Sequence, residues 1–200
     1  NIQSTQIPSN KTSPQEIHHS ALQQILDSAA VKGTILIFDA QADTYYSNDF
    51  EWAKQGKLPA STFKITNSII ALETKVVEND STIFKWDGEA RRLKRWEQDL
   101  TFKQAFHYSC VPCYQDIARQ IGEKRMNAYL QKLDYGNMVV DSSSIDLFWL
   151  VGESTISPFE QVDFLKRFYH SQLPIATRTE HIMKSLMVME KTDAYILSGK

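Results

Sequence analysis

A serine and a lysine three residues apart are the residues of this chain best suited to chemistry. Ser61 and Lys64 follow Pro59 and Ala60 at the head of an apolar run. If that run is a helix, positions i and i+3 share a face, so the amine can lie beside the hydroxyl. A serine becomes nucleophilic when a neighbouring base takes its proton, and lysine is such a base when burial lowers its pKa. The two residues are therefore a candidate Ser-Lys catalytic pair.

The simpler alternative is a helix cap followed by a solvated lysine, because Ser-x-x-Lys is common by chance. The residues that follow Lys64 argue against it. Apolar side chains recur at helical spacing and also on neighbouring positions, which predicts a helix buried on several sides. A buried helix is an unusual place for a lysine. The apolar residues are Ile65, Ile69, Ile70, Ala71, Leu72 and Val76.

The elements around this pair predict an α+β fold. A capping signature at residues 13–16 predicts a first helix that ends near Gly33. Residues 34–38 are almost continuously apolar and predict a central strand, and residues 44–47 predict the returning strand of a hairpin.

The second half of the sequence is mostly helical. Capping residues and apolar spacing predict a further helix capped by Thr179, and a last strand at 195–198. Helices are also expected over 101–106, 112–121, 124–133 and 157–169. We expect one domain over residues 1–200, with a mainly helical lobe inserted at 79–173. A sheet needs partners for the last strand, so we expect this domain to be C-terminally incomplete.

Composition and charge exclude some partners. The chain has 200 residues and a formal net charge of −2, which gives no reason to expect nucleic acid or an anionic membrane as partner. No apolar run is long enough to span a bilayer. The first residue is Asn1 and no signal peptide precedes it, as in a cleaved precursor or a trimmed chain.

Two cysteines, Cys110 and Cys113, have the spacing of a redox Cys-x-x-Cys motif. That motif should follow a strand, whereas here it follows a predicted short helix. Two small residues packed near a helix start is the favoured interpretation, and a disulfide between them stays open in an oxidising compartment. Two cysteines and five scattered histidines make no zinc pattern, so no metal is expected.

Four further positions each have a structural and a functional interpretation. Ser109 is an N-cap or turn residue, or a hydroxyl that relays a proton. Residues 135–137 (Tyr-Gly-Asn) form a turn, or a loop beside a cleft. Trp149, in the apolar Phe-Trp-Leu triplet 148–150, is core, or donates its indole N–H to an acceptor formed on Lys64. Lys200 is too isolated to interpret alone, but could supply charge for an anionic substrate.

Taken together and in order, these motifs resemble the class D β-lactamases, a family of serine enzymes also called oxacillinases. The likeness runs from about residue 33 to residue 200. It implies the β-lactamase/transpeptidase-like fold, in which helices flank an antiparallel sheet. The matching segments are 59–64 (Pro-Ala-Ser-Thr-Phe-Lys), 84–88 (Phe-Lys-Trp-Asp-Gly), 109–111 (Ser-Cys-Val), 135–137 (Tyr-Gly-Asn), 148–150 (Phe-Trp-Leu) and Lys200.

The resemblance implies catalytic roles for specific residues. Ser61 would be the acylated nucleophile, and Lys64 the general base after reaction with carbon dioxide to a carbamate. Burial favours that reaction because it requires a neutral amine. Ser109 would carry a proton to the leaving nitrogen, and Trp149 would donate to the carbamate.

Other positions would shape the pocket and bind the substrate. The side chains of Phe63 and Val111 would keep the surroundings of Lys64 apolar. Tyr135, Gly136 and Asn137 would line the cleft, and Lys200 would bind substrate.

The implied reaction is hydrolysis of a β-lactam ring through an acyl-enzyme. No cofactor is expected apart from carbon dioxide or bicarbonate, and the implied protein is a periplasmic or secreted monomer or homodimer. The backbone N–H of Ser61 would suit an oxyanion hole. Lys200 matches the first residue of the family's Lys-Thr-Gly motif, and its last two residues are absent. We therefore expect a chain ending at Lys200 to fold poorly and hydrolyse little.

Three other functions have some support in these motifs. A β-lactam sensor domain of a membrane receptor would be acylated but would not release product. A penicillin-binding transpeptidase would lack the pairing of a tryptophan with a carbamate, so Trp149 argues against it. A thioredoxin-like role for Cys110 and Cys113 is remote.

Overall fold

The computed structural model describes residues 13–200, which form two compact units divided after Gln55. Each unit is described by itself. The single domain with an inserted lobe at 79–173 stays a prediction.

The first unit is a small sheet with two helices. Its elements are β1 (Gln15–His18), α1 (Ser20–Ser28), β2 (Leu36–Asp39), β3 (Thr44–Ser47) and α2 (Phe50–Ala53). The strand order is β1-β3-β2, with β3 parallel to β1 and antiparallel to β2. The antiparallel pair confirms the predicted hairpin.

Two details of the prediction for this unit are wrong. The capping signature at 13–16 does not begin a helix, because Gln15 starts strand β1 and pairs with Thr44; the helix begins at Ser20. The strand within 34–38 is real, but among the described residues it lies at the edge of the sheet. Ile37 is 46% exposed, so the apolar run does not reflect burial on both faces.

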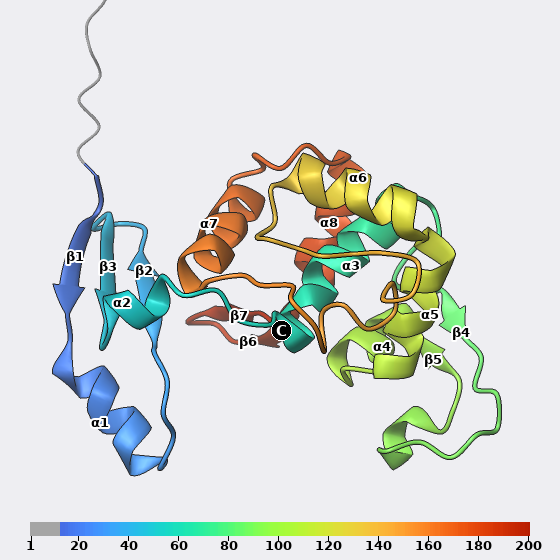
Figure 1. Cartoon of the computed structure of the whole chain (residues 1–200), viewed down its shortest axis with the longest axis horizontal. Helices are drawn as coiled ribbons and strands as arrows, with labels where there is room; N and C mark the ends of the chain where they lie inside the picture. Colours follow the sequence, from blue (N-terminus) through green and yellow to red (C-terminus); the bar gives the residue numbers. More distant parts are fainter. Residues whose placement is uncertain (1–12) are drawn as a thin grey trace, which may run out of the picture. The chain divides into compact units, whose positions relative to one another are not determined.

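The second unit is built around helix α3, which other helices surround (Figure 1). Its helices are η1 (Ala60–Thr62), α3 (Phe63–Glu73), η2 (Lys94–Trp96), α4 (Phe102–His107), α5 (Val111–Ile121), α6 (Glu123–Leu133), α7 (Pro158–Tyr169) and α8 (Thr177–Leu186). Its strands form two separate antiparallel pairs, β4 (Ile83–Phe84) with β5 (Leu100–Thr101) and β6 (Val188–Lys191) with β7 (Ile196–Ser198).

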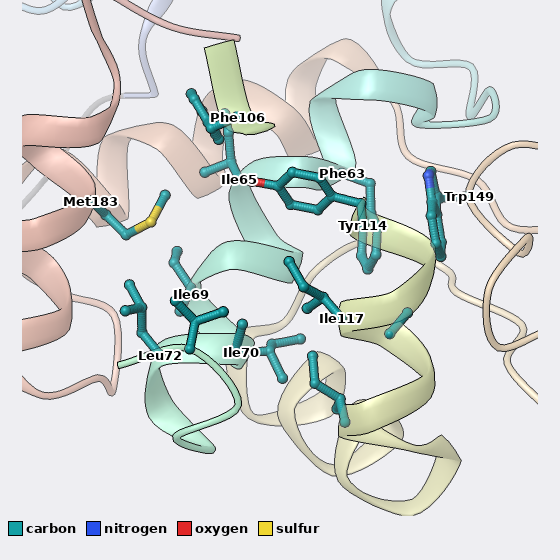
Figure 2. Close-up of a cluster of buried hydrophobic side chains, with 14 of the residues drawn as sticks. Phe63, Ile65, Ile69, Ile70, Leu72, Phe106, Tyr114, Ile117, Trp149 and Met183 are labelled. Atoms are coloured by element: carbon teal, nitrogen blue, oxygen red, sulfur yellow. The ribbon is translucent and has the colours of Figure 1, made fainter. Parts of the chain in front are cut away.

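Helix α3 is buried along its length because it packs against α5 on one side and α8 on another. Every residue from Phe63 to Leu72 is buried. Figure 2 shows this core, in which Ile69 and Ile70 of α3 lie among side chains of neighbouring helices. The expectation of a helix buried on several sides is confirmed.

Local capping signals were reliable in the second unit. Thr101 and Ser157, the first residues of two predicted helical ranges, each form a capping box with a Gln or Glu side chain three residues later. Gly122 ends α5, as predicted. Thr179 is not the cap of α8, because the helix begins two residues earlier. Its hydroxyl instead donates to the Glu73 carboxylate at 2.6 Å, which joins α8 to the end of α3.

Candidate active site

The side chains of Ser61 and Lys64 face each other at the start of α3. The Lys64 Nζ and the Ser61 Oγ are 3.4 Å apart. Ser61 lies in the 3-10 turn η1, is half-buried and so stays accessible, whereas Lys64 is 0% exposed. The i, i+3 relation predicted from sequence therefore brings the hydroxyl and the amine together.

The environment of Lys64 favours a neutral amine. Burial lowers the pKa of Lys64 from 10.5 to about 8, and the positive charge of Lys200 acts in the same direction. No carboxylate within residues 13–200 forms a salt bridge with Lys64. Its ammonium group lies 5.4 Å from the ring centroid of Tyr114. An amine that loses its proton near pH 8 can act as a base at ordinary pH.

The backbone before Ser61 adopts an unusual conformation. Ala60 has a φ of 48°, in the left-handed region that residues with a Cβ seldom occupy. Its N–H donates to the Trp149 carbonyl at 2.9 Å, which fixes the chain there. Such a conformation costs of order 1–3 kcal/mol and persists where the surroundings enforce it. Among the described residues no acceptor is found for the Ser61 N–H, so this group is available to a ligand.

Ser109 and Lys200 meet at one carbonyl group. The Phe106 carbonyl accepts hydrogen bonds from the Ser109 N–H at 3.1 Å and from the Lys200 Nζ. Ser109 is the turn residue between α4 and α5, with a φ of 52°. Lys200 is half-buried near the start of α3, where the end of the chain lies in Figure 1. Burial lowers the pKa of Lys200 to about 8.

Trp149 packs directly on the residues that flank the Ser61 turn. Its ring stacks on Phe63, with centroids 5.4 Å apart. Figure 2 shows the two side chains next to each other. Trp149 is 0% exposed, yet its indole N–H has no acceptor in the part of the chain that the structure describes. A buried donor without a partner costs about 1–3 kcal/mol, which marks the position as one where a further acceptor would be favourable. Val111 is half-buried at the start of α5 and packs on the same core.

The first residue of the segment 135–137 packs against Phe63, next to the candidate site. Tyr135 is 1% exposed, and its hydroxyl donates to Gln161 of α7 at 2.9 Å. Its ring packs on Phe63, with centroids 5.9 Å apart. Tyr135 thus supports Phe63 and exposes almost no surface, so its contact with a substrate stays a prediction.

The next two residues are exposed and form a fixed bridge. Asn137 exchanges two backbone hydrogen bonds of 2.8 Å with Thr155. Gly136 has a φ of 56°, and a Cβ there would lie 2.7 Å from the Thr155 carbonyl oxygen. Only glycine fits this position without displacing backbone.

Three residues that join the helix of Lys64 to α5 were not predicted from the sequence. The Tyr114 hydroxyl and Ser68 Oγ are 2.7 Å apart, and Asn67 donates to the Tyr114 carbonyl at 3.3 Å. These contacts hold the start of α5 against α3. Serine, asparagine and tyrosine on two helices predict no contact by themselves; the signal that could have found them is their polarity on faces otherwise apolar.

Cys110 and Cys113 form a disulfide within the first turn of α5. The possibility left open by the sequence is therefore realised. Within the described residues no cluster of three or more His, Cys, Asp or Glu side chains has a metal-binding arrangement. No helix between residues 13 and 200 has the length and apolar character of a membrane span.

Comparison with known proteins identifies the family. Residues 30–200 match the family model of the penicillin binding protein transpeptidase domain. The chain is 43% identical over 171 residues to beta-lactamase OXA-10 of Pseudomonas aeruginosa and 41% identical over 169 residues to beta-lactamase OXA-48 of Klebsiella pneumoniae. These alignments cover 86% and 84% of this chain.

Solved structures agree. The class D β-lactamase YbXI from Nostoc superposes with a TM-score of 0.87 and 40% identity, covering 90% of this chain and 75% of that one. FUS-1, a class D β-lactamase of Fusobacterium nucleatum, has a TM-score of 0.87 at 33% identity, over 92% of this chain and 76% of that one. The fold and the site define a penicillin-binding transpeptidase-like domain, and the chain belongs to the class D β-lactamase family within it. The predicted family and fold class are thereby confirmed. The chain spans 64% and 63% of the length of the curated relatives OXA-10 and OXA-48.

Proposed function

We propose that the protein hydrolyses the β-lactam ring of penicillin-type antibiotics through an acyl-enzyme on Ser61. The observation that carries this proposal is the buried Lys64 amine 3.4 Å from the Ser61 hydroxyl, with its pKa lowered to about 8. Relatives at 43% and 41% identity that are named beta-lactamases support it.

The surroundings of Lys64 also suit a carbamylated lysine. Carbon dioxide reacts with the neutral amine, and burial supplies that form. The indole N–H of Trp149, which has no acceptor within residues 13–200, is a donor that an acceptor on Lys64 would satisfy. When present, the carbamate supplies an anionic oxygen base in place of an amine. Phe63, stacked on Trp149, and Val111 keep this region apolar.

The remaining residues serve acylation. Ser61 attacks the lactam carbonyl as its proton passes to the base on Lys64, and the carbonyl oxygen gains negative charge. The Ser61 N–H, at the start of α3, can donate to that oxygen and stabilise the charge. Ser109 can return a proton to the ring nitrogen as the C–N bond breaks. Water then hydrolyses the ester and releases Ser61.

Lys200 supplies the positive charge for an anionic substrate. Penicillin-type antibiotics carry a carboxylate, and the half-buried Lys200 amine lies beside the turn of Ser109. The proposal extends to a periplasmic or secreted protein, present as a monomer or homodimer.

Hydrolysis by the full-length protein with and without added bicarbonate tests this mechanism. We expect turnover of a chromogenic cephalosporin to rise with bicarbonate, and a Trp149→Ala variant to need more bicarbonate for half-maximal activity. Trp52→Phe, a change in the first unit, is the matched control and should respond as the wild type does. Absence of a bicarbonate response in wild type and Trp149→Ala would contradict the carbamylated base.

Intact mass spectrometry separates hydrolysis from sensing. An acyl adduct on Ser61 that forms and then clears supports the β-lactamase. An adduct that persists without turnover would instead indicate the sensor domain considered from the sequence.

A further inference from the structure

A disulfide lies directly beside two residues of the candidate active site. Cys110 follows Ser109 and precedes Val111, and its partner Cys113 lies within the same first turn of α5. The proposed mechanism uses neither cysteine.

The two cysteine residues differ in exposure. Cys110 is 1% exposed, whereas Cys113 is half-buried. Both line a pocket of about 470 Å³ whose other walls include Trp86, Trp96 and Pro112. This pocket does not include Ser61 or Lys64, so a molecule in it need not occupy the active site.

The charged side chains of the pocket are paired with one another or with neighbours. Arg91 contacts Asp87 at 2.5 Å and Arg119 contacts Asp146 at 2.6 Å. Selection by net charge is therefore weak, and the feature that distinguishes this pocket is the disulfide itself. Small thiols are the class of ligand that can react with a disulfide.

The geometry also determines which sulfur is attacked and which leaves. An incoming thiolate reaches the more accessible Cys113. Cys110 then departs as a thiolate, and its Sγ already accepts from the Cys113 N–H at 3.3 Å. It lies at the N-terminus of the eleven-residue helix α5, where backbone N–H groups stabilise a negative sulfur.

We propose that the Cys110–Cys113 disulfide is a thiol-exchange site, entered through this pocket by low-molecular-mass thiols, that controls the neighbouring catalytic turn. The control of catalysis rests on the proposed function, whereas the exchange chemistry does not.

The exchange proceeds in two balanced steps. The first external thiolate bonds to Cys113 Sγ while the S–S bond breaks and its electron pair goes to Cys110 Sγ. A second thiolate attacks the external sulfur of this mixed disulfide and releases Cys113 as a thiolate. Two external thiols are oxidised to one disulfide, two electrons pass to the protein, and the two thiol protons end on the cysteines or in the buffer.

Reduction should loosen the turn that holds Ser109. The left-handed φ of 52° at Ser109 persists only if its surroundings enforce it. The disulfide is one such constraint, together with the hydrogen bond from the Cys110 N–H to the Ala105 carbonyl at 2.9 Å. Its loss would let Ser109 and Val111 shift relative to Lys64.

The first experiment maps the exchange independently of activity. The folded full-length protein is incubated with glutathione, free thiols are blocked with N-ethylmaleimide, and the peptide carrying both cysteines is analysed by tandem mass spectrometry. We expect glutathione on Cys113 and the blocking group on Cys110. Glutathione on Cys110, or reaction only after unfolding in guanidinium, would overturn the proposal.

The second experiment measures kcat and KM for a chromogenic cephalosporin in the oxidised and reduced protein. We expect kcat to fall about tenfold on reduction, which is less than the ~10²-fold loss that a 1 Å misplacement can cause. KM should change by less than about twofold, because the change affects a step after binding. Reoxidation should restore kcat.

A Cys110→Ala/Cys113→Ala double variant is the control. It should have the kcat of the reduced protein and show no response to thiols. A lower melting temperature with unchanged kcat, in the reduced protein or in this variant, would overturn the control of catalysis. Glutathione could be found on Cys113, as expected, while neither redox form hydrolyses a β-lactam. That result would support the exchange site and contradict the proposed function.

Discussion

The start of α3 carries residues of the candidate site and the hairpin β6–β7 leads directly to Lys200, but the fold holds these two regions very differently. At the start of α3, Lys64 is completely buried between packed helices. In the hairpin, Ile196 is 58% exposed and Leu197 is 54% exposed. Lys200 is held mainly through the Phe106 carbonyl, and Gly199 through a backbone bond to Met187. A helical core would thus position the proposed acylation chemistry, whereas a few polar contacts would position the proposed substrate-binding Lys200.

Removing the proposed nucleophile, Ser61, should have the largest effect at the start of α3. Ser61→Ala should lower kcat/KM by ~10⁴- to 10⁶-fold, because loss of a nucleophile removes the covalent route. Steady-state kinetics of the full-length protein on a penicillin provides the measurement. The exposed Ser142→Ala should retain wild-type activity. Substantial turnover by Ser61→Ala would exclude the acyl-enzyme on this residue.

Among the backbone positions near the candidate site, Gly136, beside the Asn137–Thr155 bridge, should lose the most stability on substitution. Gly136→Ala places a Cβ 2.7 Å from the Thr155 carbonyl oxygen at a φ of 56°, so the unfolding free energy should fall by about 4 kcal/mol. Gly88→Ala is a matched control, with a φ of 86° and open space around the Cβ, and should cost about 1–2 kcal/mol. Chemical denaturation compares the two. Equal losses would show that crowding at Thr155 adds nothing.

The buried positive charge of Lys64 should destabilise the helical core around it. Because the pKa of Lys64 is lowered to about 8, the unfolded chain binds a proton there between about pH 8 and 10.5 that the folded chain does not. Stability therefore falls as the pH falls through this window, and the deficit stays constant at lower pH. In buffer free of carbon dioxide, where Lys64 stays an amine, Lys64→Met should raise the unfolding free energy by about 3 kcal/mol at pH 7, with the gain shrinking towards pH 10.5.

Denaturation of wild type and variant across this pH range checks the prediction. Lys124→Met, at an exposed position on α6, should show no such pH-dependent gain. A gain from Lys64→Met that does not change with pH would contradict the role of the lowered pKa.

The smallest effect should lie in the hairpin. In the 200-residue chain, Ile196→Ala should change the unfolding free energy by less than about 0.5 kcal/mol, because the side chain is mostly exposed. The same change at Ile69, which is 0% exposed, should cost about 2–5 kcal/mol. A large loss at Ile196 would mean that the hairpin is packed more tightly than its exposure indicates.

Sequence patterns predicted the helical half of this molecule well, for a physical reason. Capping boxes at Thr101 and Ser157 and the end of α5 at Gly122 depend on local hydrogen bonds and backbone freedom, which short motifs encode. The same local rules failed at residues 13–16. There pairing with β3, which is distant in the sequence, prevailed over the capping signature.

In the candidate site, too, contacts within one helical turn were predictable and contacts between distant segments were not. The Ser61–Lys64 contact was predictable because it lies within one helical turn. The meeting of Ser109 and Lys200 at the Phe106 carbonyl was not, because a backbone acceptor has no sequence signature. The left-handed Ala60 was also hidden, since its conformation is imposed by Trp149 far along the chain.

Helix α7 tethers the loop behind the site at two points along its axis. Gln161 accepts from the Tyr135 hydroxyl, and Arg167 donates to the carbonyls of Leu133 and Asp134 at 2.8 and 2.9 Å. One residue inserted between Gln161 and Arg167 would turn the second tether by about 100° relative to the first. Insertions and deletions should thus be tolerated far less in this helix than in the exposed segment 141–143. Differences in length among related chains are expected to fall in that segment.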